Sequence, residues 1–440
     1  MVPQIIILVP EFQITANGKL DRKALPQIDH VLNQPSTTGL EEQPLSGIEC
    51  SLRQAWAHIL QKDISKIRTY DHFFKLGGDS ISAILLISKY QKLGYQFSVP
   101  LVYQYPKLEQ QAHLGTQSEN MIPEPLLTKY DFPHISLSGT GFQKILAQIH
   151  QRGIPLAQVE DILPCIAVQG GLLMNLSLDP STYLVQMAIK LTGQLDPDQL
   201  IHAWASVVNQ HSSLRTLFIE SPNTLSQGFL QVVLTTLPTA WTISDQPLNS
   251  IEAFFIKNRQ QGFTLQEHMV RNFVFPTPNS QIHNIIITIH HSLIDGWSLP
   301  LLLQQWMVTY HHQGLARSLP HTSFPAVVKY ICQSDPTLAQ IFWTNYLYNI
   351  TVTPAPLIYP DYIGLPGYAS YSTPLKISKA QLLQITQSLG ISIATLFRAA
   401  YALVLGQLLN QDDVTFGVII SGRSLNIPGM DQVIGPCTNT

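Results

Sequence analysis

Two polar, proline-bearing segments interrupt the apolar patterning of the chain. They are residues 29–42, HVLNQPSTTGLEEQ, and residues 113–154. Clusters of Pro, Gly, Ser, Thr and Asn between periodic segments are typical of linkers. We therefore divide the 440 residues into three pieces, 1–28, 43–112 and 155–440, in line with a prior of about 150 residues per domain.

The middle piece, residues 43–112, has the apolar spacing of a small helical domain. Ser46 and Glu49 form a capping-box pattern ahead of apolar residues that recur at helical intervals. A second helix is predicted from Ser80 to Leu93, where a glycine follows and ends it. Helices rather than strands therefore account for this piece.

The third piece, residues 155–440, alternates apolar strands with helices, which indicates an α/β domain. The predicted strands are 183–191 and 284–291, and the predicted helices are 200–211 and 299–312, with one more near 140–152 in the second linker.

Charge and cysteine usage exclude several classes of protein. Only 12% of the residues are charged and the net charge is −3, so nucleic acid is not an expected partner. The four cysteines show no CxxC spacing, so neither zinc nor a disulfide framework is expected. The N-terminus lacks a basic region ahead of its short apolar run, and no apolar run reaches the ~20 residues of a membrane span. We expect a soluble, cytoplasmic chain without membrane association.

The stretch FFKLGGDSIS, residues 73–82, places a serine after a glycine pair and ahead of an apolar helix. Asp79 and Ser80 are both good helix caps, so a plain cap is one interpretation. A hydrolase nucleophile is disfavoured because the GxSxG pattern is absent. A modification site is the third interpretation.

The wider stretch DHFFKLGGDSISAI, residues 71–84, resembles the modification site of acyl- and peptidyl-carrier domains. The resemblance covers residues 43–112 and implies a small four-helix domain. It also implies that a separate phosphopantetheinyl transferase attaches 4′-phosphopantetheine to Ser80, with Asp79 and Gly78 beside it. A phosphodiester at the start of a helix is favoured by the helix dipole and the free N–H groups.

The segment TANGKLDRKAL, residues 15–25, resembles the last motif of adenylation domains in nonribosomal peptide synthetases. Residues 1–28 are then the tail of such a domain, and an upstream adenylation domain is an expected partner. The resemblance implies that Lys19 reaches an acyl phosphate in the family. Because the body of that domain lies outside this sequence, we expect Lys19 to be idle here.

The heptapeptide HHSLIDG, residues 290–296, ends the apolar strand predicted at 284–291. Adjacent residues on a strand point to opposite faces, so His290 and His291 are poorly placed to hold one metal ion together. We therefore expect no metal site here. Histidines at a strand end often serve only to satisfy hydrogen bonds, which is the structural alternative.

HHSLIDG resembles the HHxxxDG motif of condensation domains, which belong to the chloramphenicol-acetyltransferase-like superfamily. Four further stretches resemble other motifs of that family in the same order: residues 159–173, 210–218, 416–423 and 434–440. The resemblance implies a two-lobed α/β fold and a segment of a nonribosomal peptide synthetase, a multifunctional enzyme of secondary metabolism, possibly fungal. It also implies amide-bond formation between a donor thioester on Ser80 and an amine on a carrier of a downstream module.

The resemblance assigns roles to the residues of the motif. His291 acts as a general base on the amine or orients it by a hydrogen bond, and both alternatives remain open. Asp295 holds the loop through an ion pair with Arg423 or Arg215. Two further residues complete the set of expected site residues: Gly296, which leaves space for the arm, and His290, which points away from the tunnel.

Condensation domains of this family continue well beyond the motif that resembles residues 434–440. We therefore expect residues 155–440 to hold a condensation domain with an incomplete second lobe. Two other functions stay open: a non-catalytic carrier and docking fragment, and an acyltransferase that uses the His291–Asp295 core with soluble coenzyme A as donor.

Overall fold

A computed structural model describes residues 47–95, 97–114, 140–193, 196–222, 228–244, 247–276, 282–312, 322–350, 353 and 372–440. Contacts divide the chain into two compact units, Met1–Cys50 and Ser51–Thr440. The expectations for Lys19 and Ser46 lie outside the described residues.

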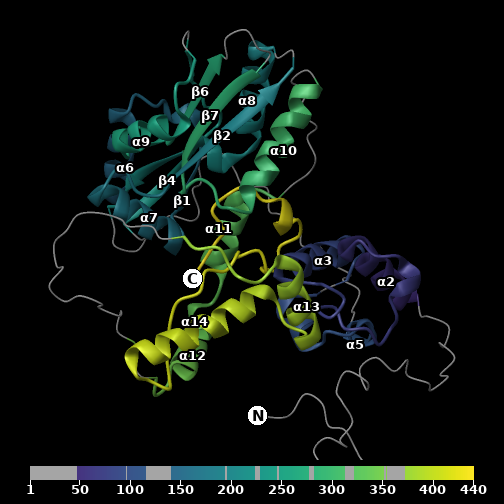
Figure 1. Ribbon diagram of the computed structural model, residues 1–440. Helices are drawn as coiled ribbons and strands as arrows, with labels where there is room; N and C mark the ends of the chain where they lie inside the picture. The colour runs from purple at the N-terminus through teal and green to yellow at the C-terminus, as the bar shows by residue number, and fades with distance from the viewer. Residues whose placement is uncertain are drawn as a thin grey trace, which may run out of the picture. The chain divides into compact units, whose positions relative to one another are not determined.

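Residues 47–114 form the small helical domain that the sequence predicts (Figure 1). Its helices are α2 (Gly47–Leu60), α3 (Ser80–Lys92), α4 (Val99–Gln104) and α5 (Leu108–Leu114), with the 3₁₀ turn η1 (Ile64–Lys66) after α2. Gly94 follows α3 with a φ of 86°, the left-handed conformation in which glycine ends helices at little cost.

A hydrogen-bonded triad ties three of these helices together inside the apolar core. Trp56 of α2 donates from Nε1 to the hydroxyl of Tyr90 at 2.7 Å, and that hydroxyl donates to Oε1 of Gln111 at 2.7 Å. Because each buried polar group has a partner, the triad fixes α2, α3 and α5 without a desolvation penalty. Leu52, Phe73, Leu86, Val102 and Leu108 fill the core around it.

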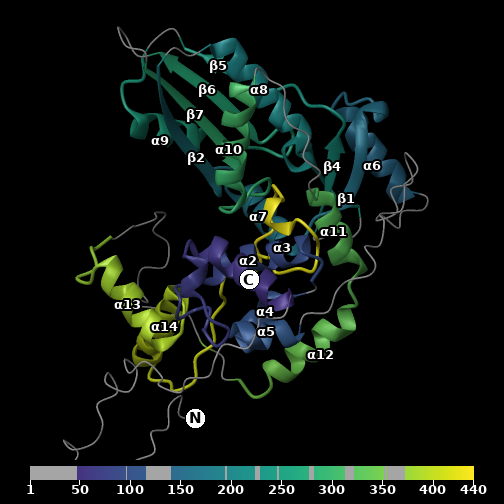
Figure 2. The ribbon, with the colours of Figure 1, turned by 90° about the vertical axis from the view of Figure 1, so that its right-hand side faces the viewer.

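The described part of the larger domain contains two sheets (Figures 1 and 2). The first has the order β1 (Val159–Pro164), β4 (Phe229–Leu234) and β3 (Thr216–Glu220), and all its pairs are antiparallel. The second has the order β2 (Leu184–Thr192), β7 (Ile282–His290), β6 (Val270–Pro276) and β5 (Trp241–Ile243), with only β5 parallel to its neighbour.

The helices of this domain follow the alternation that the sequence predicts. They are α6 (Thr140–Gln151), α7 (Ala167–Leu178), α8 (Pro197–Gln210), α9 (Ile251–Gln261), α10 (Ser298–His311), α11 (Phe324–Gln333), α12 (Pro336–Tyr346), α13 (Lys379–Leu389) and α14 (Ile393–Leu409). Among the described residues, the 3₁₀ turns that accompany them are η2 (Leu156–Gln158), η3 (Ser212–Arg215) and η6 (Met430–Gln432).

Strand β7 is buried on both faces because helices cover the second sheet from two sides (Figure 1). Ile285, Ile287 and Ile289 pack in one core with residues of α8 and α10. On the other face, Phe254 of α9 packs against Phe273 of β6 at a centroid distance of 5.0 Å. A strand buried on both faces needs a continuous apolar run, and the sequence IIITI supplies it.

Helix α6 packs on the first sheet, although its residues fall in the segment that the sequence indicates as a linker. Ile145 and Ile149 of α6 share an apolar cluster with Ile162 of β1 and Leu230 and Val232 of β4. Helix α6 therefore contributes to the core on which the first sheet packs.

Large apolar side chains face solvent on α12, α13 and α14. Leu338 of α12 is 69% exposed and Leu403 of α14 is 71% exposed. In the part of the chain that the structure describes, no single helix is both long and apolar enough to span a membrane. The pair α13 and α14 passes that test of length and composition only when joined across a bend of 90°.

Candidate functional site

The turn after β7 carries the HHSLIDG residues at the end of the second sheet. His290 is the last residue of β7 and pairs with Leu184 of β2. His290 is fully buried, whereas His291 is partly exposed. The two histidines thus occupy different environments, as the alternation of side chains along a strand requires.

His290 is held inside the protein as a neutral ring. The N–H of Ser292 donates to its Nδ1 at 3.3 Å, and the hydroxyl of Ser292 lies 2.8 Å from the same nitrogen. Burial, with a smaller contribution from the neighbouring His291, lowers the pKa of His290 to about 4.

His291 is anchored through its backbone while its ring stays available. Its N–H donates to the carbonyl of Tyr183 at 2.9 Å. Its Nδ1 is buried without a hydrogen-bond partner among the described residues. Tyr183 has a φ of 53°, a left-handed conformation that is unusual for a bulky residue and costs energy. Strained backbone of this kind is often found at functional sites.

Asp295 and Arg423 form a fully buried ion pair. The guanidinium Nη2 lies 3.0 Å from Oδ1 and 3.1 Å from Oδ2 of the carboxylate, and both side chains are 0% exposed. The carboxylate also accepts from the N–H of Ser298 at 2.8 Å and of Cys437 at 3.0 Å. Arg423 donates in addition to the carbonyl of Val433 at 2.6 Å. The pair therefore ties the HHSLIDG turn to residues 423–437.

The two arginines considered for Asp295 have separate partners. Arg215 donates from Nη1 to Oε2 of Glu160 at 2.7 Å and to the carbonyl of Leu234. It thus bridges β1 and β4 of the first sheet, and the expectation that it is an alternative partner of Asp295 is wrong. Gly296 is exposed, and a Cβ added there would meet no atom within 4 Å.

Asp79 and Ser82 form the capping box of α3. Asp79 is the N-cap residue, and its Oδ1 accepts from the N–H of Ser82 at 2.7 Å. The hydroxyl of Ser82 accepts in return from the N–H of Asp79 at 2.6 Å. Ser80 is the first residue of α3, so the plain-cap interpretation belongs to Asp79 and Ser82.

The glycine pair before Ser80 is required by close packing. Gly77 has a φ of 102°, and a Cβ on Gly78 would lie 2.4 Å from the ring of Phe73.

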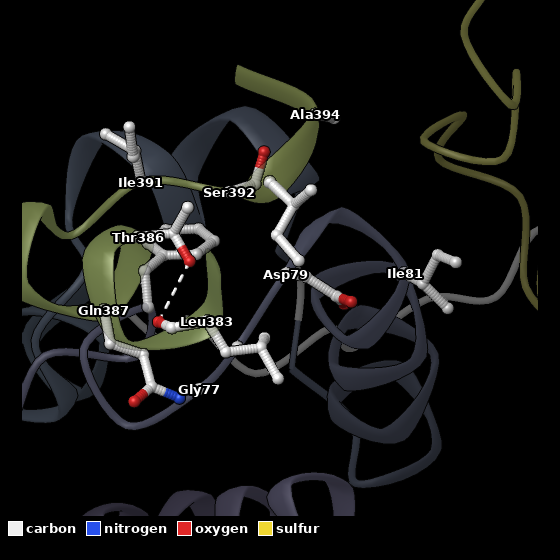
Figure 3. A pocket seen from close by; sticks show the side chains of 12 residues that line it. Gly77, Asp79, Ile81, Leu383, Thr386, Gln387, Ile391, Ser392 and Ala394 are labelled. Atoms are coloured by element: carbon white, nitrogen blue, oxygen red, sulfur yellow. Dashed lines mark hydrogen bonds between the residues drawn. The ribbon is translucent and has the colours of Figure 1, made fainter. Parts of the chain in front are cut away.

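A pocket adjoins this loop and is lined by Gly77, Gly78, Asp79 and Ile81, and by residues of α13 and its junction with α14 (Figure 3). In this pocket the hydroxyl of Thr386 of α13 donates a hydrogen bond to the backbone carbonyl of Leu383.

Several residues of the site were missed from the sequence. Ser298 is the first residue of α10, and its hydroxyl lies 2.7 Å from Asp295 and 2.9 Å from Nη2 of Arg423. Cys437 contributes a backbone N–H to Asp295. No pattern in the sequence indicates that Tyr183 belongs to the site, because neither a positive φ nor a long-range backbone contact can be predicted from residue types.

A helical domain with a serine at the start of a capped helix, joined to an α/β domain with a histidine beside a buried Asp–Arg pair, defines a carrier domain followed by a condensation domain. Residues 159–440 match the family described as "Condensation domain", and residues 50–114 match the "Phosphopantetheine attachment site" family. The chain belongs to the condensation-domain family and carries a phosphopantetheine-binding domain ahead of it. Condensation domains form amide bonds between carrier-bound substrates.

Curated relatives that match the whole chain are fungal nonribosomal peptide synthetases. The chain is 32% identical over 454 residues to the nonribosomal peptide synthetase ungA' of Aspergillus campestris, and 30% identical over 454 residues to the AM-toxin synthetase AMT1 of Alternaria alternata. It spans 4% and 10% of the lengths of these two proteins.

Two solved structures share the fold. The condensation domain from the Monacolin K polyketide synthase MokA has a TM-score of 0.51 at 16% identity, over 64% of this chain and 67% of that one. A structure described as holo T3CT has a TM-score of 0.50 at 24% identity, over 69% of this chain and 67% of that one.

Proposed function

We propose that this chain is a donor carrier and condensation segment that forms an amide bond. In this reaction the acceptor nitrogen bonds to the acyl carbon of the donor thioester, the carbon–sulfur bond breaks, and the proton lost by the nitrogen balances the sulfur, which leaves as a thiol. The observation that carries the proposal is the partly exposed His291 on a turn fixed by the buried Asp295–Arg423 pair.

His291 is the residue that handles the amine proton. The partnerless Nδ1 is buried, so Nε2 is the nitrogen left to meet substrate. From there His291 either accepts the proton or orients the amine by a hydrogen bond, and a positioned base contributes about 100- to 10,000-fold. Asp295 and Arg423 keep the turn in place and do not meet the substrate, because both are fully buried.

Ser80 is the residue that accepts phosphopantetheine. The position of Ser80 suits the group, since Ser80 is the first residue of the 13-residue helix α3. Helix N-termini favour phosphate through the dipole and free N–H groups. When attached, the group supplies a thiol on a flexible arm that carries the acyl chain. A phosphopantetheinyl transferase, an upstream adenylation domain and a downstream module are the proposed partners.

The second lobe is proposed to be completed by residues outside this sequence. The apolar side chains exposed on α12, α13 and α14 support this proposal, because exposed patches of that kind are usually covered in the working protein. A chain without that cover should condense its substrates slowly. A non-catalytic docking role would follow if no condensation occurs even after the lobe is extended.

The decisive experiment is a condensation assay with a loaded carrier. Ser80 is charged with an aminoacyl group by a phosphopantetheinyl transferase and aminoacyl coenzyme A, and a soluble aminoacyl thioester serves as acceptor. Amide product is measured by mass spectrometry, for this chain and for a version extended beyond Thr440. The extended version should form product, and His291→Ala should lower the rate by about 100-fold or more.

Two controls separate the competing functions. Ser80→Ala should abolish product from a carrier-bound donor; equal product from soluble acyl coenzyme A in that variant would establish the acyltransferase alternative instead. His290→Gln tests the neighbouring buried ring and should act through stability. A full rate in His291→Ala would refute the catalytic assignment.

A further inference from the structure

A buried pair of glutamines connects the two sheets at the HHSLIDG turn. Gln169 lies in the first turn of α7, and Gln231 lies in the middle of β4, the central strand of the first sheet. Each side chain is 1% exposed. Neither has a role in the function proposed above, and burying two amides is costly unless their hydrogen bonds are made.

Both N–H groups and the oxygen of the Gln169 amide are hydrogen-bonded. Its Oε1 accepts from the N–H of Ile166 at 3.1 Å. Its Nε2 donates to Oε1 of Gln231 at 2.9 Å and to the backbone carbonyl of Ser292 at 3.0 Å. Gln231 is held in turn, because its Nε2 donates to the carbonyl of Pro164 at 2.9 Å. The orientation of the Gln169 amide is therefore fixed by the first sheet and by the start of α7.

The carbonyl of Ser292 is the point where this network meets the turn. The N–H of Ser292 is bound to the ring of His290, and the N–H of His291 is bound to the carbonyl of Tyr183. Gln169 supplies the remaining contact, on the side of the turn that faces the first sheet. The backbone on both sides of His291 is thus held by hydrogen bonds.

We propose that Gln169 is a positioning residue for His291, acting through the carbonyl of Ser292 and oriented by Gln231. The expected effect of Gln169 on the reaction rate rests on the proposed function of His291. Its expected effect on the position of the His291 ring does not. Loss of the Ser292 contact frees one side of the turn while the Asp295–Arg423 pair still holds the other. Misplacement of a reacting group by about 1 Å can cost 100-fold in rate.

The test compares two variants, Gln169→Glu and Gln231→Glu. Each places a carboxyl group of the same size and shape as the original amide at one of two neighbouring buried positions. Gln169→Glu replaces the donating Nε2 with oxygen and loses the bond to Ser292. Gln231→Glu replaces its own Nε2 but keeps the Oε1 that accepts from Gln169, so the contact of Gln169 with Ser292 remains. The full chain is labelled at the histidine Cε1 position, and the NMR signal of His291 is assigned by its loss in His291→Gln.

The His291 signal should move or broaden in Gln169→Glu and change much less in Gln231→Glu. In the condensation assay, Gln169→Glu should lower kcat by about 10- to 100-fold with little change in the KM of the acceptor. Equal changes of the His291 signal in both variants, or no change in either, would overturn the proposal. If Gln169→Glu does not fold, Gln169→Met removes the same contact without a charge and is judged by the same signal.

The two proposals fail in different ways. A shifted His291 signal in Gln169→Glu together with a full rate in His291→Ala would leave the positioning role intact and reject the catalytic one. A normal His291 signal together with a strong effect of His291→Ala would do the reverse.

Discussion

The Asp295 carboxylate and the Arg423 guanidinium lie 3.0 Å apart with both side chains withdrawn from water, although 128 residues separate them in the sequence. Three further donors converge on the carboxylate: two from Ser298 and one from Cys437. These donors and the guanidinium compensate the charge of the Asp295 carboxylate. Removal of the carboxylate leaves the Arg423 guanidinium charged, buried and without its ion-pair partner.

Asp295→Ala should therefore destabilise the condensation domain by about 3–5 kcal/mol, the usual cost of leaving one partner of a buried pair unpaired. Lys329→Met is the matched control, since Lys329 meets Asp161 at 3.9 Å with both side chains partly exposed; it should cost about 0–1 kcal/mol. Urea denaturation measures both. Similar losses of unfolding free energy in the two variants would contradict the expectation that breaking the buried pair costs more than breaking the partly exposed one.

Ser80→Ala should prevent loading of phosphopantetheine, whereas Ser82→Ala should still be loaded. Ser82 closes the capping box of α3, so its loss should lower the stability of the carrier domain by about 1 kcal/mol. Intact-mass analysis after incubation with transferase and coenzyme A separates the two effects. A mass gain that persists in Ser80→Ala would place the modification elsewhere.

Acid should destabilise the second sheet between about pH 6.5 and pH 4. Burial lowers the pKa of both His290 and His268 to about 4 in the folded protein. In that window the unfolded chain binds more protons than the folded one, so the free energy of unfolding falls as the pH falls, by up to about 1.4 kcal/mol per pH unit and histidine. Hydrogen exchange of the β7 amides at pH 7 and pH 5 measures the change.

His290→Gln should flatten this pH dependence, because it removes one of the two titrating rings. His202, exposed on α8, provides the control variant His202→Gln, which should keep the slope of the unmodified protein. An unchanged slope in His290→Gln would mean that its ring does not titrate in this range.

Gly78→Ala should destabilise the carrier domain by about 1–3 kcal/mol, the range for inserting a methyl group into a well-packed site. The new Cβ would lie 2.4 Å from the Phe73 ring and 2.9 Å from the Phe73 carbonyl oxygen. Gly47→Ala is the control, since its Cβ would meet nothing within 4 Å. Thermal unfolding of both variants checks the prediction, and equal midpoints would show that the loop adapts.

Local patterns in the sequence were enough to locate several of the elements. The apolar run at 284–291 corresponds to β7, Ile282–His290, and the helix expected from Ser80 to Leu93 is α3, Ser80–Lys92. These elements depend on residue spacing and caps, which are properties of neighbouring residues. The different environments of His290 and His291 follow from strand alternation in the same way.

Long-range partners could not be predicted with the same success. Arg215 and Arg423 were equal candidates for Asp295, and only the fold shows that Arg215 is occupied by Glu160. Gln169 stands in a stretch that resembles a family motif, but nothing in its neighbours indicates that its amide reaches Ser292, 123 residues away. Such contacts depend on how the two sheets pack, which residue spacing does not encode.

Helix α6 has a practical consequence for anyone who recombines domains of this kind. Ile145 and Ile149 cover the first sheet from a position ahead of residue 159, where the family match begins. An excision or module exchange at residue 159 would strip that cover and expose Ile162 and Leu230 to water, inviting aggregation. Junctions between Leu114 and Thr140 keep α6 with the sheet on which it packs, so chimeric enzymes spliced there should retain soluble, folded condensation domains.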